Sequence, residues 1–119
     1  MTRGALVLGV ALSAVGCASA TPIAGVGELA GDWHGRVSGP AGHARAALVV
    51  ATSGDYKGTM YLEGGDRSFH GALVVVRPGQ VRYQGTDGNG TVRISEDSGR
   101  RRLRFLRDDG VVDAFFERR

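Results

Sequence analysis

Residues 100 to 117 read Arg100-Arg-Arg-Leu-Arg-Phe-Leu-Arg-Asp-Asp-Gly-Val-Val-Asp-Ala-Phe-Phe-Glu117. Two stretches that alternate apolar and polar residues flank Asp109-Gly110, a dipeptide that favours a two-residue type I′ hairpin turn. A turn there sets a register whose pairs are Asp108 with Val111, Arg104 with Phe115, Arg102 with Glu117, Leu103 with Phe116 and Phe105 with Ala114. Because this register also brings the apolar side chains onto one side, the segment predicts an antiparallel hairpin with one buried face.

The same alternation runs through the chain from Leu29 onward, with almost no helical periodicity. Clusters of Gly, Asp, Asn, Ser and Pro interrupt it about every ten residues. These breaks leave about eight predicted strands, at residues 32–38, 43–51, 55–63, 68–77, 80–86, 90–96, 100–107 and 111–117. Connections this short join only neighbouring antiparallel strands, since a parallel crossover needs about a dozen residues or more. The predicted fold class is therefore all-β, a small antiparallel up-and-down meander.

An aromatic-x-Gly triplet recurs within the predicted strands. It occurs at Trp33-His34-Gly35, Tyr56-Lys57-Gly58, Phe69-His70-Gly71 and Tyr83-Gln84-Gly85. Glycine usually weakens a strand, but a strongly bent barrel strand uses glycine at its bend, where a nearby aromatic ring covers the gap. An open meander would also leave two unpaired edges. We therefore expect the sheet to close into a small up-and-down barrel.

The start of the first strand, Gly31-Asp32-Trp33, resembles the G-x-W motif of lipocalins and their calycin relatives. The resemblance implies a barrel in which Trp33 plugs the closed end. The folded part is much shorter than a lipocalin, and no helix is predicted after the last strand. Because tryptophan, tyrosine, phenylalanine and methionine are all predicted to point inward, we expect these side chains to fill the interior rather than leave it open to a ligand.

The N-terminal residues carry a separate signal. Arg3 precedes an apolar run at residues 4–15, and small residues follow, which is the pattern of an export signal. As a helix the run would rise about 18 Å, short of the ~30 Å hydrocarbon core, so it does not predict a stable membrane span. Ala14-Val15-Gly16-Cys17 resembles the lipobox of bacterial lipoproteins, and this implies that Cys17 receives a lipid.

A second cleavage site competes with the lipobox. Ala18-Ser19-Ala20 fits an ordinary signal peptidase, and cleavage there would remove Cys17 and release a soluble secreted or periplasmic protein. Lipidation is favoured because the single cysteine has no partner for an intrachain disulfide. The predicted organisation is a signal peptide at 1–16, a flexible tether at 17–28 and a β-barrel domain at 29–119.

The charge pattern leaves two interpretations open. The chain has 15 basic and 12 acidic residues, a balance that argues against nucleic acid as a partner. The densest basic feature is an arginine stripe of outward-facing residues, Arg93, Arg100, Arg102 and Arg104. The stripe either binds an anionic surface, such as lipid headgroups or an acidic polymer, or pairs with Asp113 and Glu117 on the last strand.

The sequence offers little for catalysis. His34, His43 and His70 are scattered, without metal-ligand spacing, and no serine has a nucleophile-elbow pattern around it. We therefore expect no cofactor and no metal, and a lipid-anchored, non-enzymatic binding or structural module of the bacterial cell envelope. An envelope protein or an anionic polymer would be its partner beside the membrane. The alternative is a calycin-like carrier of a small apolar ligand, which an internal volume of a few hundred Å³ would favour.

Overall fold

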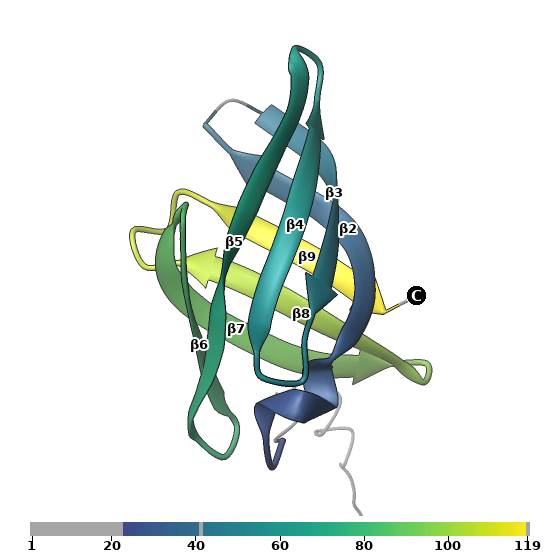
Figure 1. Cartoon of the computed structure of the whole chain (residues 1–119), viewed down its shortest axis with the longest axis vertical. Helices are drawn as coiled ribbons and strands as arrows, with labels where there is room; N and C mark the ends of the chain where they lie inside the picture. The colour runs from purple at the N-terminus through teal and green to yellow at the C-terminus, as the bar shows by residue number, and fades with distance from the viewer. Residues whose placement is uncertain (1–22, 41, 119) are drawn as a thin grey trace, which may run out of the picture.

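The computed structural model describes residues 23–40 and 42–118, and these form a closed antiparallel barrel (Figure 1). A short 3-10 helix, η2 (Val26–Leu29), precedes the barrel. The strands are β2 (Gly31–Gly39), β3 (Gly42–Val50), β4 (Asp55–Leu62), β5 (Gly65–Arg77), β6 (Gln80–Gly85), β7 (Gly88–Asp97), β8 (Arg100–Arg107) and β9 (Asp113–Arg118). Each strand pairs with the next, and β2 pairs with β9 to close the sheet. The predicted all-β up-and-down barrel is confirmed.

The alternation of the sequence decides which face of each strand is buried. Every strand contributes to one apolar core inside the barrel, and on β3 the burial alternates residue by residue through Ala44, Ala46, Leu48 and Val50. Burying one large apolar side chain contributes about 1.5–3 kcal/mol, so a register slip that turned these residues outward would be costly. The hydrophobic effect therefore fixes the register of the whole barrel.

Two of the aromatic-x-Gly triplets lie against each other on β4 and β5. Tyr56 is directly opposite Gly71, and Phe69 is directly opposite Gly58. A methyl group at Gly58 would overlap with the Phe69 ring, and one at Gly71 would lie 2.5 Å from the Tyr56 hydroxyl. Each ring thus occupies the space that a side chain on the facing glycine would need, which explains why glycine is present inside these strands.

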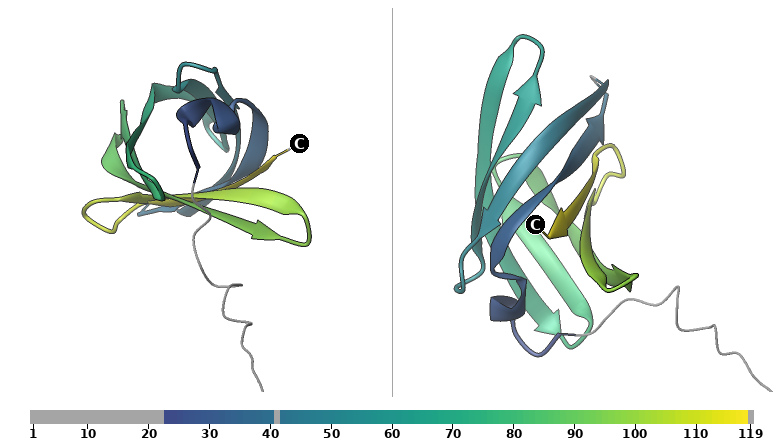
Figure 2. Two further views of the ribbon diagram at one scale, coloured as in Figure 1. Left: turned by 90° about the horizontal axis from the view of Figure 1, so that it is seen from below. Right: turned by 90° about the vertical axis from the view of Figure 1, so that its right-hand side faces the viewer.

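The segment that precedes β2, with η2, lies across one end of the barrel (Figure 2), and the buried Trp33 of β2 is bonded to this segment. The Trp33 side chain is 1% exposed, and its Nε1–H donates a hydrogen bond of 2.9 Å to the backbone oxygen of Leu29. The guanidinium group of Arg118 lies over the Trp33 ring. The closed antiparallel architecture is compatible with a calycin-like fold.

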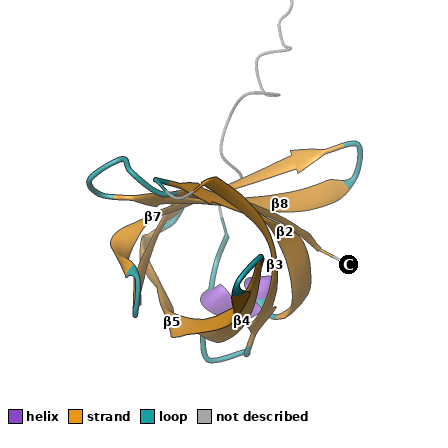
Figure 3. Cartoon of the chain, turned by 90° about the horizontal axis from the view of Figure 1, so that it is seen from above, coloured by secondary structure: helices purple, strands orange, loops and turns teal. Residues whose placement is uncertain are grey.

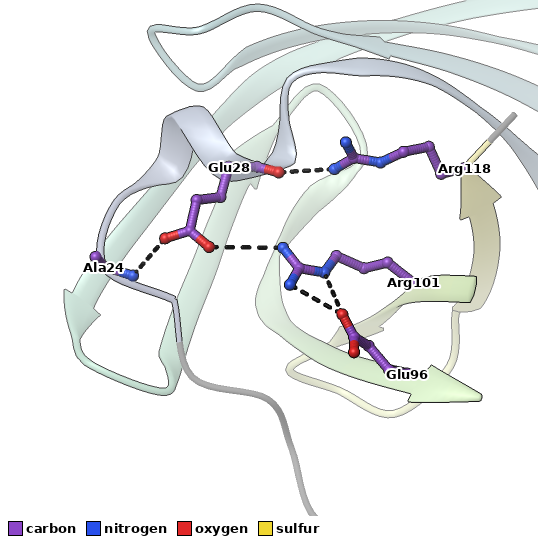
Figure 4. Close-up of polar contacts among 5 residues, drawn as sticks. All are labelled: Ala24, Glu28, Glu96, Arg101 and Arg118. Atoms are coloured by element: carbon purple, nitrogen blue, oxygen red, sulfur yellow. Dashed lines mark hydrogen bonds and ion pairs between the residues drawn. The ribbon is translucent and has the colours of Figure 1, made fainter. Parts of the chain in front are cut away.

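The folded domain begins earlier than expected. The tether was predicted to continue to Glu28, but Ile23 is 2% exposed and belongs to the core. Glu28 holds this segment in place, because its Oε2 accepts a hydrogen bond of 2.8 Å from the backbone N–H of Ala24 (Figure 4). Its Oε1 lies 3.6 Å from Nη1 of Arg101, and its backbone oxygen accepts a bond of 2.7 Å from Arg118.

The hairpin between β8 and β9 has the predicted register but not the predicted turn. The Gly110 N–H donates to the Arg107 oxygen at 2.8 Å, and the Arg107 N–H donates to the Val112 oxygen at 3.0 Å. Gly110 has a φ of 75°, but Asp109 is not in the positive-φ region that a type I′ turn requires. The Asp109 carboxylate instead accepts the N–H of Val111 and binds Arg107, which stabilises a longer loop over residues 108–111.

Candidate functional site

The barrel holds a cavity of about 320 Å³, so the expectation of a filled interior is wrong. The cavity lies toward the end opposite η2, and its lining includes residues of the loops after β2, β6 and β8. Figure 3 looks into this end, with η2 visible across the far end of the ring of strands. Small inward-facing residues contribute to this space, because Ala44 on β3 and Ala114 on β9, on either side of Val37, fill little of the interior.

The wall of the cavity is mainly apolar and contains an aromatic cluster. Phe105 lies 5.9 Å from Tyr56, 5.1 Å from Tyr83 and 5.5 Å from Phe116, measured between ring centres. Such edge-on pairs contribute about 0.5–1.5 kcal/mol each beyond the burial of their area. The cluster lines the cavity and also belongs to the core, so the wall is formed before any ligand arrives.

Two tyrosine hydroxyls add polar groups to this wall. Burial raises the pKa of Tyr56 and the pKa of Tyr83, so both hydroxyls keep their protons well above neutral pH. Among the described residues neither hydroxyl has a hydrogen-bond partner. A phenol hydroxyl can both donate and accept a hydrogen bond, so these two groups can bond to a polar group of a ligand.

Charged residues gather at the mouth of the cavity, around Asp87. Nη2 of Arg67 on β5 lies 2.8 Å from Oδ1 of Asp87 in the loop between β6 and β7. Nη1 of Arg107 on β8 donates to the backbone oxygen of the same Asp87 at 3.1 Å. All three residues line the cavity. We name Arg67, Asp87 and Arg107 the mouth cluster, and it joins three separate parts of the barrel wall.

The interpretation of the sequence missed the mouth cluster, although the alternation contains the signal. Phe69 and Phe105 point inward, and Arg67 and Arg107 lie two residues away from them along the same strands. Residues two apart along a strand lie on the same face of the sheet, so both arginines are on the inner face of the barrel. From the sequence, only the outward-facing arginines of the stripe were considered as a possible binding site.

The structure brings the arginine stripe and the acidic residues of β9 together. Nε of Arg102 lies 2.8 Å from Oε2 of Glu117, and Nη2 of Arg104 lies 2.8 Å from Oδ2 of Asp113. Nη1 of Arg100 is more loosely placed, 3.9 Å from Glu117. The hydrogen bonds that Arg104 donates to Asp113 raise the pKa of Arg104. The expected cross-strand pairs are therefore present, and binding of an anionic surface stays the untested alternative.

The remaining predicted site residues give a mixed result. Arg93 lies directly opposite Arg104 on the barrel surface, and no ion pair of Arg93 is seen within the described ranges. Cys17 and the signal peptide lie outside the described residues. His43 forms a hydrogen bond with Ser38 across the β2–β3 hairpin, with 2.8 Å between Nδ1 of His43 and Oγ of Ser38.

Within residues 23–40 and 42–118, no three His, Cys, Asp or Glu side chains come close enough together to hold a metal ion. The same part of the chain contains no helix of sufficient length and hydrophobicity to span a membrane. Comparison with known proteins finds no matching family model, no matching curated protein and no matching solved structure.

Proposed function

We propose that this protein is a non-enzymatic binding protein that carries a small, largely apolar molecule inside its barrel. The cavity is the observation that supports this proposal, because about 320 Å³ falls in the usual range of ligand pockets, about 300–1,000 Å³. A water molecule in the liquid takes up about 30 Å³, so a cavity of 320 Å³ has room for on the order of ten non-hydrogen atoms. The ligand is therefore a short chain or a single ring.

We also propose that the protein is exported and attached to a membrane of the cell envelope through a lipid on Cys17. The apolar run at residues 4–15 and the small residues before Cys17 support this part of the proposal. Two or more acyl chains give stable attachment, which a single chain does not. An anchored carrier keeps its ligand in the envelope.

A cavity-filling variant tests the carrier function. Ala44→Leu places a larger side chain on the inward face of β3, at a residue that lines the cavity. Ala47→Leu on the same strand adds the same atoms to the outward face and is the matched control. The probe is decan-1-ol, a neutral single chain of a size that the cavity can hold, and its binding is measured by isothermal titration calorimetry.

We expect the wild type and the Ala47→Leu variant to bind the probe with equal affinity. Ala44→Leu should weaken binding about tenfold or more, a loss of about 1.4 kcal/mol, because the added atoms take up the space of the probe. Circular dichroism checks that both variants keep their β structure. Equal binding by the two variants would show that the probe does not occupy the cavity.

A further inference from the structure

We propose, on the basis of the carrier function above, that the ligand is amphipathic and carries an anionic head group such as a carboxylate. Its apolar part occupies the cavity, and Arg67 and Arg107 hold its head group at the mouth. The inference depends on the direction of these two side chains, on their unused hydrogen-bond donors and on the shortage of acceptors around them.

Both arginines belong to the inner surface of the barrel. Arg67 is directly opposite Met60, a buried residue that lines the cavity. Arg107 follows Phe105 by two residues on β8, and its Cδ lies 2.8 Å from the position that a Cβ on Gly88 would take. Gly88 therefore leaves the space through which the Arg107 side chain passes. A charged guanidinium group on the inner face of a small barrel loses contact with water, which costs free energy unless a polar or charged partner binds it.

The mouth has more hydrogen-bond donors than acceptors. A guanidinium group has five N–H donors and no acceptor, and Arg67 uses one nitrogen, Nη2, in its contact with Asp87. Tyr56 and Tyr83 line the same cavity, and each hydroxyl can donate one hydrogen bond as well as accept one. Among the described residues that line the cavity, Asp87 is the single carboxylate, and its Oδ1 already binds Arg67. A head group that accepts hydrogen bonds fits this surplus of donors.

Arg107 is held in place by Asp109. Its Nε donates to both carboxylate oxygens of Asp109, at 3.0 and 3.1 Å, and its Nη2 lies 2.9 Å from Oδ2 of the same residue. Nη1 donates to the backbone oxygen of Asp87, which lines the cavity. The hydrogen bond from Arg107 also lowers the pKa of Asp109. Asp109 is therefore a positioning residue that directs one guanidinium nitrogen toward the cavity, and Arg67, with its side chain 60% exposed, is free to move onto an incoming head group.

Three probes with the same ten-carbon chain test the inference: decanoate, decan-1-ol and decyltrimethylammonium, each below its micelle concentration. Binding to the full-length protein is measured by isothermal titration calorimetry at low salt. We expect decanoate to bind about tenfold more tightly than decyltrimethylammonium, or about 1.4 kcal/mol, since hydrogen bonds that involve charged groups are the stronger ones.

The double variant Arg67→Gln, Arg107→Gln should remove this preference and leave the affinity for decan-1-ol within about twofold. The matched control is Arg36→Gln, Arg45→Gln, which removes two facing arginines from the outside of β2 and β3 and so changes the net charge equally. The control should keep the preference for decanoate. Circular dichroism verifies that both double variants are folded.

The outcomes separate the inference from the function on which it rests. If none of the three probes binds, the carrier function is wrong and the head-group inference fails with it. If all three bind equally well, or the ammonium compound binds best, the carrier function stands and the head-group inference is wrong. The inference is also wrong if decanoate is still preferred by the Arg67→Gln, Arg107→Gln variant.

Discussion

The guanidinium group of Arg118 lies 4.7 Å from the ring centre of Trp33, and these two residues are also directly opposite each other where β9 pairs with β2. The contact therefore joins the last strand to the first at the place where the barrel closes. The same Arg118 side chain binds the backbone oxygen of Glu28, at the C-terminal part of η2. One pair of side chains thus contacts both the β2–β9 pairing that closes the sheet and the segment that covers its end.

Replacement of Trp33 by alanine should lower the free energy of unfolding by about 3–5 kcal/mol, because a large, fully buried ring is lost. Arg118→Gln should cost about 0.5–1 kcal/mol, since it removes a cation–π contact at an exposed position. Urea denaturation followed by circular dichroism measures both. A cost below 1 kcal/mol for Trp33→Ala would contradict the burial of this ring.

Gly58→Ala should destabilise the barrel by about 1–3 kcal/mol, because the new methyl group overlaps with the Phe69 ring. Gly25→Ala is the control, since nothing lies within 4 Å of the position that its Cβ would take. In the double variant Gly58→Ala, Phe69→Leu the two effects should not add, because the smaller side chain removes the overlap. Additive losses in thermal denaturation would show that the ring and the glycine are independent.

The buried tyrosines predict that stability falls in alkali. Burial raises the pKa of Tyr56 and of Tyr83 in the folded state above the value of about 10 found in unfolded chains. Their contribution to stability is therefore complete below pH ~10 and is lost as the pH rises toward the folded-state values. Free energies of unfolding between pH 9 and 12 should fall less steeply in the Tyr56→Phe, Tyr83→Phe variant, and equal slopes would argue against burial of the two hydroxyls.

The arginine stripe should not bind anionic membranes. Exposed ion pairs contribute about 0–1 kcal/mol each, so replacing Arg100, Arg102 and Arg104 by glutamine should have little effect on stability. Vesicle sedimentation with phosphatidylglycerol, using Cys17→Ser protein, measures binding without the lipid anchor. Salt-sensitive binding that disappears in the triple variant would make the stripe a binding site after all.

Lipidation predicts a change of cell fraction for one substitution. Cys17→Ser should move the protein from the membrane fraction to the soluble fraction, and radiolabelled fatty acid should enter the wild type alone. Absence of the label from the wild type would favour cleavage at Ala18-Ser19-Ala20 instead.

The alternation of residues was sufficient to predict the fold, because a period of two determines the buried face and the short breaks determine the topology. Turn geometry was less predictable. The Asp109 side chain binds its own loop, and a pair of positive φ values typical of a type I′ turn occurs instead at Ser98 and Gly99, 53° and 80°. Local hydrogen bonds of this kind compete with the backbone preference of the dipeptide.

The candidate site could be predicted only in part. The pattern gives the direction of a side chain but not the distance between opposing walls, so the cavity beside Ala44 and Ala114 could not be inferred. The inward phase of Arg67 and Arg107 was present in the sequence, yet their contact through Asp87 depends on a loop conformation. The burial of Ile23 was hidden in a segment of small, turn-prone residues, where composition suggested a tether.

The position at which the chain enters the barrel has a consequence for orientation at a membrane. Ile23 joins the fold at the closed end, and six peptide steps separate it from Cys17, a reach of at most roughly 20 Å. A lipid on Cys17 would therefore hold the closed end close to the bilayer and turn the mouth outward, into the aqueous space. A ligand would then enter and leave on the side away from the anchoring membrane, which favours exchange with a soluble donor or with an opposing surface.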